Sequence, residues 1–194
     1  EAFRRFVRAF PEATLLVDTY DTMRGVLHVV DLARELGAEF RVGGIRLDSG
    51  DLDRLAHDAR RCLDHAGLQQ VKIFASSSLD EYEVDGLLRG GAPIDGFGVG
   101  GRMGTSEDAP YLDTAYKLVE YAGRPRMKLS AGKSTLPGRK QVFRNGVDGK
   151  MSRDVIALAD EKLAGDPLLI QVMKNGRRLL TENLQDCRSR CRSE

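Results

Sequence analysis

The feature that most constrains the fold is one arrangement repeated four times along the chain. In each unit a short apolar run leads into a polar or glycine-rich corner and then, in most cases, into an amphipathic stretch of helical period. The units begin near Thr14, Phe40, Val71 and Ile94. Because alternating strands and helices favour a parallel sheet with the helices packed outside it, the sequence predicts an α/β fold, either open or closed as a barrel.

Beyond about Tyr116 the pattern changes to hairpins. The dipeptide Asn175-Gly176 between apolar runs is a strong hairpin signal. Residues 129–140, between two hairpins, have the composition of a cationic loop. We therefore predict three parts, listed here in order: an α/β domain over residues 1–115, a small antiparallel β domain over residues 116–180, and a basic tail over residues 181–194.

Composition excludes several classes of protein. The cysteines Cys62, Cys187 and Cys191 form no CxxC pair and have no neighbouring histidine to complete a zinc site, which favours a reducing, cytoplasmic setting. No apolar run approaches the roughly 20 residues that a membrane-spanning helix needs. The net charge is +1, and we interpret the basic C-terminal end as solvated rather than as a nucleic-acid-binding tail. We expect neither a membrane nor a nucleic acid as partner.

The candidate site follows from the strand ends. Parallel α/β folds bind ligands at the C-terminal ends of their strands. Those ends are predicted at residues 18–21, 46–51, 76–78 and 98–102. The first two corners carry carboxylates, and the last two carry small residues whose backbone N–H groups are accessible. Together they suit a sugar phosphate.

Each residue type has a physical role in such a site. Gly100 and Gly101 let backbone amides approach an anion closely. Asp18 and Asp48 can accept hydrogen bonds from ribose hydroxyls or hold a hydrated magnesium ion. Arg46 precedes Asp48 by two residues, so both side chains point to the same side of the strand. Its guanidinium group can therefore bind a carboxylate or phosphate beside that acid.

A purely structural interpretation competes with this one. Residues 48–51 also form a good helix N-cap sequence, and Ser78 and Asp80 can cap the following helix in the same way. The string GFGVGG does not fit the dinucleotide-binding fingerprint. The functional interpretation is favoured because four such corners follow one another on consecutive strands. The three histidines, His28, His57 and His65, lie inside predicted helices, which argues against a histidine-activated nucleophile.

The corner motifs resemble those of a known family. They read LLVDTYDT, GIRLDSGDL, IFASSSLDEY and DGFGVGGRM, the last continuing through YKLVEYAGRPRMKLSAGKSTLPGRKQVFR. In this order and spacing they resemble the C-terminal half of nicotinate phosphoribosyltransferase over about Glu1 to Asp160. The resemblance implies a partial, incomplete TIM-like α/β barrel of about four βα units, followed by a small antiparallel β unit.

The resemblance also implies an activity. The family makes nicotinate mononucleotide and pyrophosphate from nicotinate and phosphoribosyl pyrophosphate, a glycosyl transfer in NAD biosynthesis. ATP hydrolysis is coupled to this transfer through a phosphorylated histidine, as in a ligase, and Mg2+ accompanies phosphoribosyl pyrophosphate and ATP. No tightly bound organic cofactor is implied, and the complete enzyme is expected to be a cytoplasmic homodimer.

Carried over to this sequence, the family's site assigns residues in two groups. The candidate catalytic residues are Asp18, Arg46 and Asp48. The candidate phosphate- and ribose-binding residues are Ser49, Gly50, Ser76, Ser77, Gly98, Gly100, Gly101 and Arg102. No residue of the chain is assigned as a dedicated metal ligand.

The sequence departs from the family at its start. The family's phosphorylatable histidine lies shortly upstream of the helix that here begins at Glu1, so we expect a truncated or split piece that is inactive alone. One alternative is a non-catalytic fragment that binds a nucleotide or phosphate, or that associates with another chain. A second is a sugar-phosphate aldolase or isomerase, which needs a strand-end lysine or glutamate; Lys72, near the start of its strand, does not qualify.

Overall fold

The chain forms two compact units. The computed structural model describes residues 1–105, 114–147 and 150–193. Unit 1 comprises Glu1–Lys117 and Met127–Thr135, and unit 2 comprises Leu118–Arg126 and Leu136–Glu194. Residues 127–135 therefore lie with the α/β part of the chain, whereas our sequence-based division placed them in the β domain.

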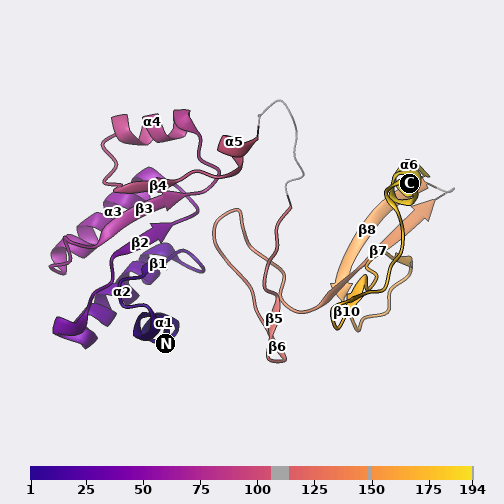
Figure 1. The fold of residues 1–194 in the computed structure, drawn as a ribbon, viewed down its shortest axis with the longest axis horizontal. Helices are drawn as coiled ribbons and strands as arrows, with labels where there is room; N and C mark the ends of the chain where they lie inside the picture. The colour runs from indigo at the N-terminus through magenta and orange to yellow at the C-terminus, as the bar shows by residue number, and fades with distance from the viewer. Residues whose placement is uncertain (106–113, 148–149, 194) are drawn as a thin grey trace. The chain divides into compact units, whose positions relative to one another are not determined.

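Unit 1 is built on a parallel sheet. Its strands are β1 (Thr14–Leu16), β2 (Gly44–Leu47), β3 (Lys72–Ser76) and β4 (Gly96–Gly98), which lie side by side in the order β1-β2-β3-β4 (Figure 1). All three pairings are parallel, and one row across the sheet joins Leu16, Arg46, Phe74 and Gly96. The predicted α/β fold with a parallel sheet is thus confirmed.

The helices of unit 1 begin and end where the sequence carries capping residues. They are α1 (Ala2–Ala9), α2 (Thr22–Leu36), the 3-10 turn η1 (Gly37–Glu39), α3 (Leu52–His65), α4 (Glu81–Arg89) and the short α5 (Gly101–Gly104). Asp21, Asp51 and Asp80 cap α2, α3 and α4 by accepting hydrogen bonds from backbone amides. Gly37 ends α2 with a φ of 53°. The predicted continuation of the fourth unit falls partly on residues 106–113, outside the described residues.

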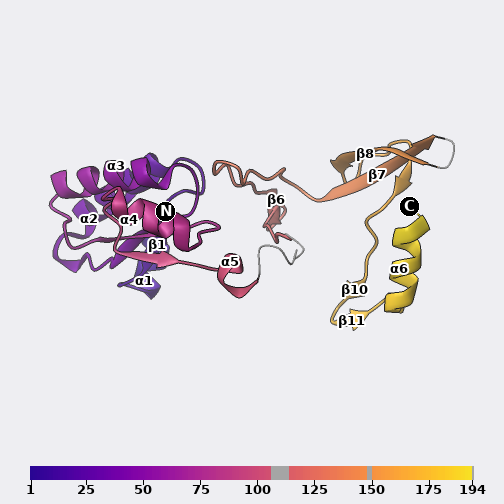
Figure 2. The same cartoon turned by 90° about the horizontal axis from the view of Figure 1, so that it is seen from above.

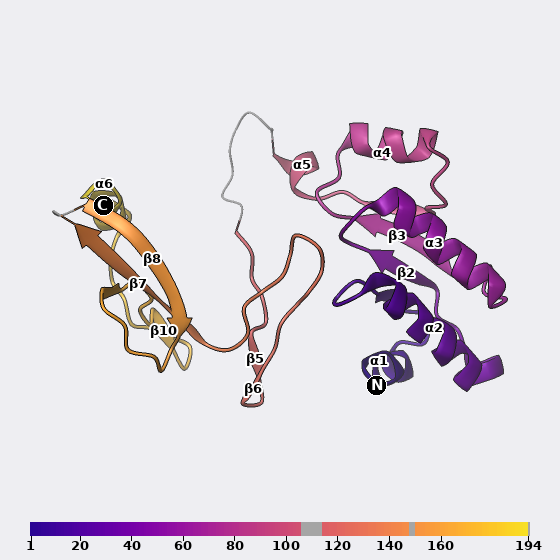
Figure 3. The same cartoon turned by 180° about the vertical axis from the view of Figure 1, so that it is seen from behind.

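The core lies between one face of the sheet and helices α2 and α3, which run alongside β2 and β3 (Figure 3). Alternate strand residues face these helices and are fully or nearly fully buried: Leu15, Val17, Ile45, Leu47, Ile73 and Ala75. The row on the other face is more open, since Arg46 is exposed and Phe74 retains 36% of its accessible surface. Parallel sheets are usually covered on both faces, so this second face is unusual.

Unit 2 is antiparallel. Its strands are β5 (Glu120–Tyr121), β6 (Arg124–Pro125), β7 (Lys140–Val147), β8 (Lys150–Leu158), β9 (Asp166–Pro167), β10 (Met173–Lys174) and β11 (Arg177–Arg178), followed by α6 (Leu184–Ser193). Figure 2 shows β7 and β8 as a long ribbon, and β9 extends it in the order β8-β7-β9. The predicted hairpin at Asn175-Gly176 is present, with left-handed φ angles of 49° and 74°.

Two negative findings apply to the described part of the chain. None of its helices has the length and apolar character needed to cross a bilayer. All three cysteines carry free thiols.

Candidate functional site

The corner that follows β2 places a carboxylate among three hydrogen-bond donors. Oδ1 of Asp48 accepts from Nη2 of Arg46 at 3.0 Å and from Oγ of Ser76 at 2.6 Å. Nε of Arg46 in turn donates to Oγ of Ser76 at 2.8 Å. Oδ2 of Asp48 accepts from Nζ of Lys133 at 2.9 Å. The structure thus brings Arg46 and Asp48 together, as the period of two along the strand predicts, and it adds Ser76 and a lysine as partners of Asp48 that the sequence analysis did not assign.

These donors determine the charge of the carboxylate. Burial by itself raises the pKa of Asp48, but the hydrogen bonds from Ser76, Lys133 and Arg46 outweigh burial and hold that pKa well below its usual range. The Asp48 side chain remains 17% exposed, and that of Arg46 is 50% exposed. An ionised carboxylate and a guanidinium group therefore both face solvent at the end of β2.

Asp18, after β1, has a different environment. It is 1% exposed, and its Oδ2 accepts from the backbone amide of Asp48 at 3.2 Å and from the hydroxyl of Ser49. No described residue donates to Oδ1 of Asp18. Asp18 therefore bonds the end of β1 to the end of β2, and its other oxygen is buried without a donor among the described residues.

A second segment of the chain is hydrogen-bonded to these two strand ends. Residues Met127–Thr135, which we call the strap, belong to unit 1. The amide of Leu129 donates to the carbonyl oxygen of Thr19 at 2.9 Å, and the hydroxyl of Ser130 donates to the carbonyl oxygen of Asp18. Lys133 completes the attachment at Asp48. The sequence signal was the cationic composition of this loop, but composition alone could not show where the loop lies.

The corner after β3 is strained. Ser77 and Ser78 have φ angles of 118° and 51°, in the left-handed region that side chains rarely adopt. Backbone strain of this kind is concentrated at functional sites, so it marks this corner as a candidate ligand contact. Gly50, after β2, also has a positive φ of 82°. Ser77 and Gly50 both line a cavity of about 470 Å³ that lies at the start of α3 and along α4.

The corner after β4 supplies glycines beside Ser76. Gly98 pairs with Ser76 in the sheet, and a Cβ atom on Gly98 would lie 3.3 Å from the Cβ of Ser76. Gly100 precedes α5 and Gly101 begins it, with open space around Gly100. The structure therefore places Gly98 beside Ser76, and Gly100 and Gly101 follow at the start of α5.

The guanidinium group of Arg102 forms ion pairs with acidic side chains of the α4 region. Its Nη1 lies 2.5 Å from Oδ2 of Asp80 and 3.6 Å from Oε2 of Glu83. Asp80 is also the cap of α4, and backbone donation from Glu83 is the main cause that lowers the pKa of Asp80. Hence Arg102 lies near the start of α4 and is already paired with acids.

The helix caps of α3 and α4 are different residues from the polar residues directly at the strand ends. The cap of α3 is Asp51, which accepts from the amide of Arg54 at 3.1 Å, so Asp48 is not needed as a cap. Likewise the cap of α4 is Asp80, and Ser78 has no such role. Asp48 and Ser78, at the strand ends, are therefore not required as helix caps.

No described histidine lies at a strand end. His57 and His65 are on α3, where the Nδ1 atoms approach the carbonyl oxygens of Asp53 and Arg61 at 3.0 and 2.7 Å. His28 is on α2. Lys72, at the start of β3, pairs with Asp95 at 2.8 Å. Among the described residues, no three histidine, cysteine or acidic side chains are grouped so that they could hold a metal ion.

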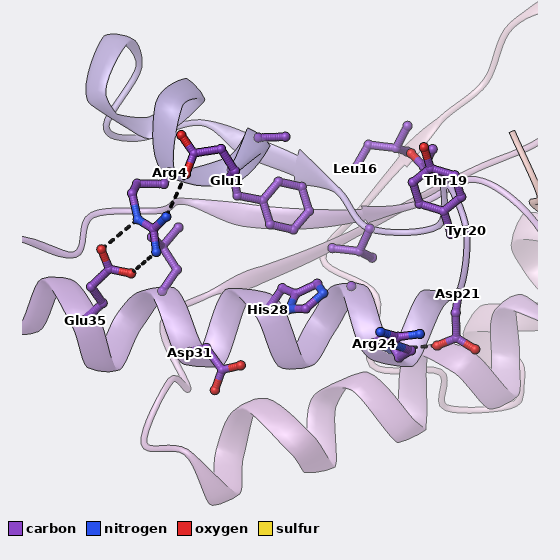
Figure 4. Close-up of a pocket in the computed structure, with 15 residues that line it drawn as sticks. Glu1, Arg4, Leu16, Thr19, Tyr20, Asp21, Arg24, His28, Asp31 and Glu35 are labelled. Atoms are coloured by element: carbon purple, nitrogen blue, oxygen red, sulfur yellow. Dashed lines mark hydrogen bonds and ion pairs between the residues drawn. The ribbon is translucent and has the colours of Figure 1, made fainter. Parts of the chain in front are cut away.

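A cavity of about 710 Å³ runs along β1, between α1 and α2 (Figure 4). Leu16 and Val17 of the β1 segment line it, together with Tyr20 and His28. At its far end Arg4 joins Glu35 with bonds of 2.6 and 2.7 Å and Glu1 with a bond of 2.9 Å. The cavity lies on the side of β1 away from β2, where no described strand pairs with β1.

Comparisons with known proteins identify relatives. The chain is 55% identical over 178 residues to the nicotinate phosphoribosyltransferase pncB2 of Mycobacterium tuberculosis, covering 92% of this chain and 38% of that protein. It is 42% identical over 171 residues to the nicotinate phosphoribosyltransferase of Bacillus subtilis, covering 84% of this chain and 35% of that protein. No protein-family model matches the chain.

Solved structures give matches of the same kind. The crystal structure of human nicotinic acid phosphoribosyltransferase shares 35% identity, covers 84% of this chain and 31% of its own, and has a TM-score of 0.44. A nicotinate phosphoribosyltransferase from Porphyromonas gingivalis shares 20% identity, covers 78% of this chain and 37% of its own, and has a TM-score of 0.45. The curated relatives confirm the resemblance inferred from the corner motifs, and the chain spans less than two fifths of their length.

Proposed function

We propose that this chain carries the ribosyl-phosphate site of a nicotinate phosphoribosyltransferase. Such an enzyme transfers a phosphoribosyl group from phosphoribosyl pyrophosphate to nicotinate and releases pyrophosphate. The observation that carries the proposal is the cluster of Arg46, Asp48 and Ser76 at adjacent strand ends, in a chain 55% identical over 178 residues to an enzyme of that name. The whole reaction is proposed for the longer protein to which such a chain corresponds.

The site suits a reaction in which positive charge develops on the ribosyl carbon as pyrophosphate leaves. The ionised Asp48 can accept a ribose hydroxyl bond and favours the developing positive charge. The exposed half of the Arg46 guanidinium can bind an anionic group of either substrate, the nicotinate carboxylate or the leaving pyrophosphate. No nucleophilic side chain is required, because transfer of this kind depends on positioning and electrostatics.

The 5′-phosphate is assigned to the corners after β3 and β4. Backbone amides near Ser77, Gly100 and Gly101 are suitable donors. The hydroxyl hydrogen of Ser76 is already donated to Asp48, so Ser76 could donate to the phosphate only by giving up that bond. Ser49 and Gly50 would border the ribose at the next corner, although the Ser49 hydroxyl already donates to Asp18. Arg102 forms an ion pair with Asp80, so it could bind the phosphate only by leaving that carboxylate for another anion.

Magnesium is best assigned to the substrate. Asp18 is buried against the β2 corner, and both oxygens of Asp48 already accept from protein donors. The described residues therefore do not fit a metal ion that is held by the protein alone. Mg2+ typically keeps several water ligands and binds through substrate phosphates, so we assign it to the diphosphate and draw no step through it.

The open face of the unit 1 sheet and the cavity beside β1 support an incomplete TIM-like barrel. In a barrel the helices lie outside and the inner face is filled by side chains from other strands. Here α2 and α3 cover one face, while Phe74 lies on the opposite face with its ring against Gly44 and Gly96 of the neighbouring strands. The cavity beside β1 would receive a further βα unit from the rest of a longer protein. ATP coupling, a homodimer and a cytoplasmic location are likewise proposals.

The direct test is calorimetric titration of the chain with nicotinate mononucleotide, followed by the variant Asp48→Asn. We expect the variant to bind at least about tenfold more weakly, since it loses a charged hydrogen-bond partner. Asp85→Asn is the matched control, because Asp85 lies on α4 and its side chain is 56% exposed. Equal affinity of Asp48→Asn and the parent chain would contradict the proposal.

A second candidate function is nucleotide binding without turnover. It requires only binding groups that unit 1 itself presents, the half-exposed guanidinium of Arg46 and the carboxylate of Asp48. An assay of ATP-dependent nicotinate mononucleotide synthesis, run on the chain alone and with the remaining segment of such a relative added, separates the two. Binding without synthesis in both mixtures supports the second candidate. Synthesis that appears only in the combined mixture supports the first.

A further inference from the structure

The strap brings a cation to the carboxylate that dominates the candidate site. Lys133 and Asp48 are separated by 85 positions in the sequence. Nζ of Lys133 nonetheless lies 2.9 Å from Oδ2 of Asp48, and it also donates to the carbonyl oxygen of the same residue. The lysine therefore holds both the side chain and the backbone of one residue at the end of β2.

The strap does not depend on this lysine for its own position. Leu129 and Ser130 attach the strap to the carbonyl oxygens of Thr19 and Asp18. The strap is also closed on itself, because the amide of Thr135 donates to the carbonyl oxygen of Lys128 at 3.0 Å, and Oγ1 of Thr135 accepts from the amide of Lys128 at 3.0 Å. The ammonium group is thus delivered to Asp48 by a segment that other bonds already anchor.

Three donors on one carboxylate limit how it can turn. Arg46 and Ser76 hold Oδ1 and Lys133 holds Oδ2, so rotation of the carboxylate would break a bond at each oxygen. An ionised carboxylate offers about four acceptor positions. One acceptor position therefore remains, on a side chain that is 17% exposed.

We propose that Lys133 is a positioning residue that fixes the Asp48 carboxylate, so that its remaining acceptor position faces a ribose hydroxyl. The identity of that ligand rests on the proposed function, but the fixing of Asp48 does not. Lys133 itself does not contact the reacting atoms. It acts through Asp48. The two residues are too far apart in the sequence for any motif to indicate that they are partners.

The first test needs no ligand. Amide hydrogen exchange is measured for the parent chain and for Lys133→Met, Lys133→Arg and Lys72→Met. Lys72→Met is the matched control, because Lys72 makes a lysine-aspartate pair of 2.8 Å at the opposite end of the same sheet. The amide of Asp48 donates to Asp18, and we expect Lys133→Met to speed its exchange by at least about tenfold, because the variant loses the charged bonds from Lys133 to Asp48.

The expected pattern is specific to positioning. Lys133→Arg, which retains the charge, should restore exchange at the Asp48 amide to within about threefold of the parent chain. Lys72→Met should leave that amide unchanged. Faster exchange confined to the strap in Lys133→Met, with the Asp48 amide unaffected, would show that the lysine only fastens the loop and would overturn the proposal. So would unchanged exchange throughout.

The second test couples the two residues. Affinity for nicotinate mononucleotide is measured for Lys133→Met, Asp48→Asn and the double variant. If Lys133 acts through Asp48, the double variant binds as weakly as Asp48→Asn alone, within about twofold. Multiplied effects of the two changes would mean that Lys133 contacts the ligand independently. If the parent chain does not bind the nucleotide, the proposed function fails for this chain, while the exchange experiment still decides the role of Lys133.

Discussion

The two units differ in how they bury apolar side chains. Unit 1 has a continuous core in which Val26, Ile45, Leu63 and Ile73 have no exposed surface. In unit 2 the buried apolar side chains among the described residues are Phe143 and Ala157, at 9% and 7% exposure. The β7–β8 ribbon leaves large apolar side chains such as Ile156 in solvent. The hairpins of unit 2 form where local turn signals occur in the sequence. Because few apolar side chains of unit 2 are buried, the hydrophobic contribution to its stability is much smaller than in unit 1.

A pair of identical substitutions tests this contrast most strongly. Ile45→Ala, at a position with 0% exposure, should lower the unfolding free energy of unit 1 by about 2–5 kcal/mol. Ile156→Ala, at 57% exposure, should change stability by about 0.5 kcal/mol or less. Urea unfolding followed by far-UV circular dichroism measures both. Similar losses for the two variants would mean that Ile156 is covered in solution.

Glycines define where the packing of unit 1 is tight. A Cβ atom on Gly25 of α2 would lie 2.0 Å from the carbonyl oxygen of Val17, a backbone atom that cannot move aside cheaply. Gly25→Ala should therefore cost about 1–3 kcal/mol or more by overpacking. The control is Gly86→Ala on α4, where no neighbouring atom lies within 4 Å and better helix propensity should add about 0.5–1 kcal/mol. Thermal melts compare the two, and a stabilising Gly25→Ala would contradict the close packing of α2 on β1.

Helix caps should matter unequally in the two units. Asp51 caps α3, a helix that contributes Ala56, Ala59 and Leu63 to the core, so Asp51→Ala should lower stability by about 1 kcal/mol. Asp51→Asn, which retains a capping oxygen, should have little effect. Oδ1 of Asn183 accepts from two amides at the start of the exposed α6.

Asn183→Ala should fray α6 without changing the main unfolding transition. Urea unfolding of the three variants checks the difference. An equal shift of the midpoint by Asp51→Ala and Asn183→Ala would place α6 in the same cooperative unit as α3.

The smallest effect is expected from an ion pair on the β7–β8 ribbon. Arg144 donates to both oxygens of Asp154 at 2.9 Å, and this bonding lowers the pKa of Asp154. A carboxyl group with a lowered pKa stabilises the folded state above its unfolded pKa, about 3.9, and this contribution is lost as the pH falls through the folded value. Arg144→Met should therefore loosen the ribbon slightly at neutral pH.

In strong acid the difference between Arg144→Met and the parent chain should vanish. NMR spectra of the β7–β8 amides at about pH 7 and about pH 2 test this expectation. The matched control is Arg153→Met, an arginine on β8 for which no bond to a carboxylate is found in the described structure. A difference that persists in acid would point to packing of the arginine stem instead of charge.

Local signals predicted the elements well because each depends on residues close in sequence. The hairpin at Asn175-Gly176 and the C-cap at Gly37 follow from backbone conformations that glycine and asparagine tolerate. The strand-end corners were found for the same reason, and the contact between Arg46 and Asp48 follows from the period of two along one strand.

The partners of those corners were harder to predict. The assignment of Asp18 to the ligand stays a prediction, and the structure adds that its side chain is buried and accepts from the backbone amide of Asp48. The assignment of Arg102 to the phosphate corner also stays a prediction, and the structure adds its ion pairs with Asp80 and Glu83. These pairings join residues that are far apart in the sequence, so they depend on distances that a linear pattern does not contain.

The sequence by itself determined the α/β fold, the antiparallel hairpins, the helix caps and the resemblance to nicotinate phosphoribosyltransferase, because these depend on periodicity, local backbone preference and motif order. Only the tertiary structure decided that the strap crosses the strand ends and that Lys133 meets Asp48. A contact between positions 85 residues apart is made by chain folding and bears no local signature. The charge state and orientation of the central carboxylate are therefore properties of the folded unit.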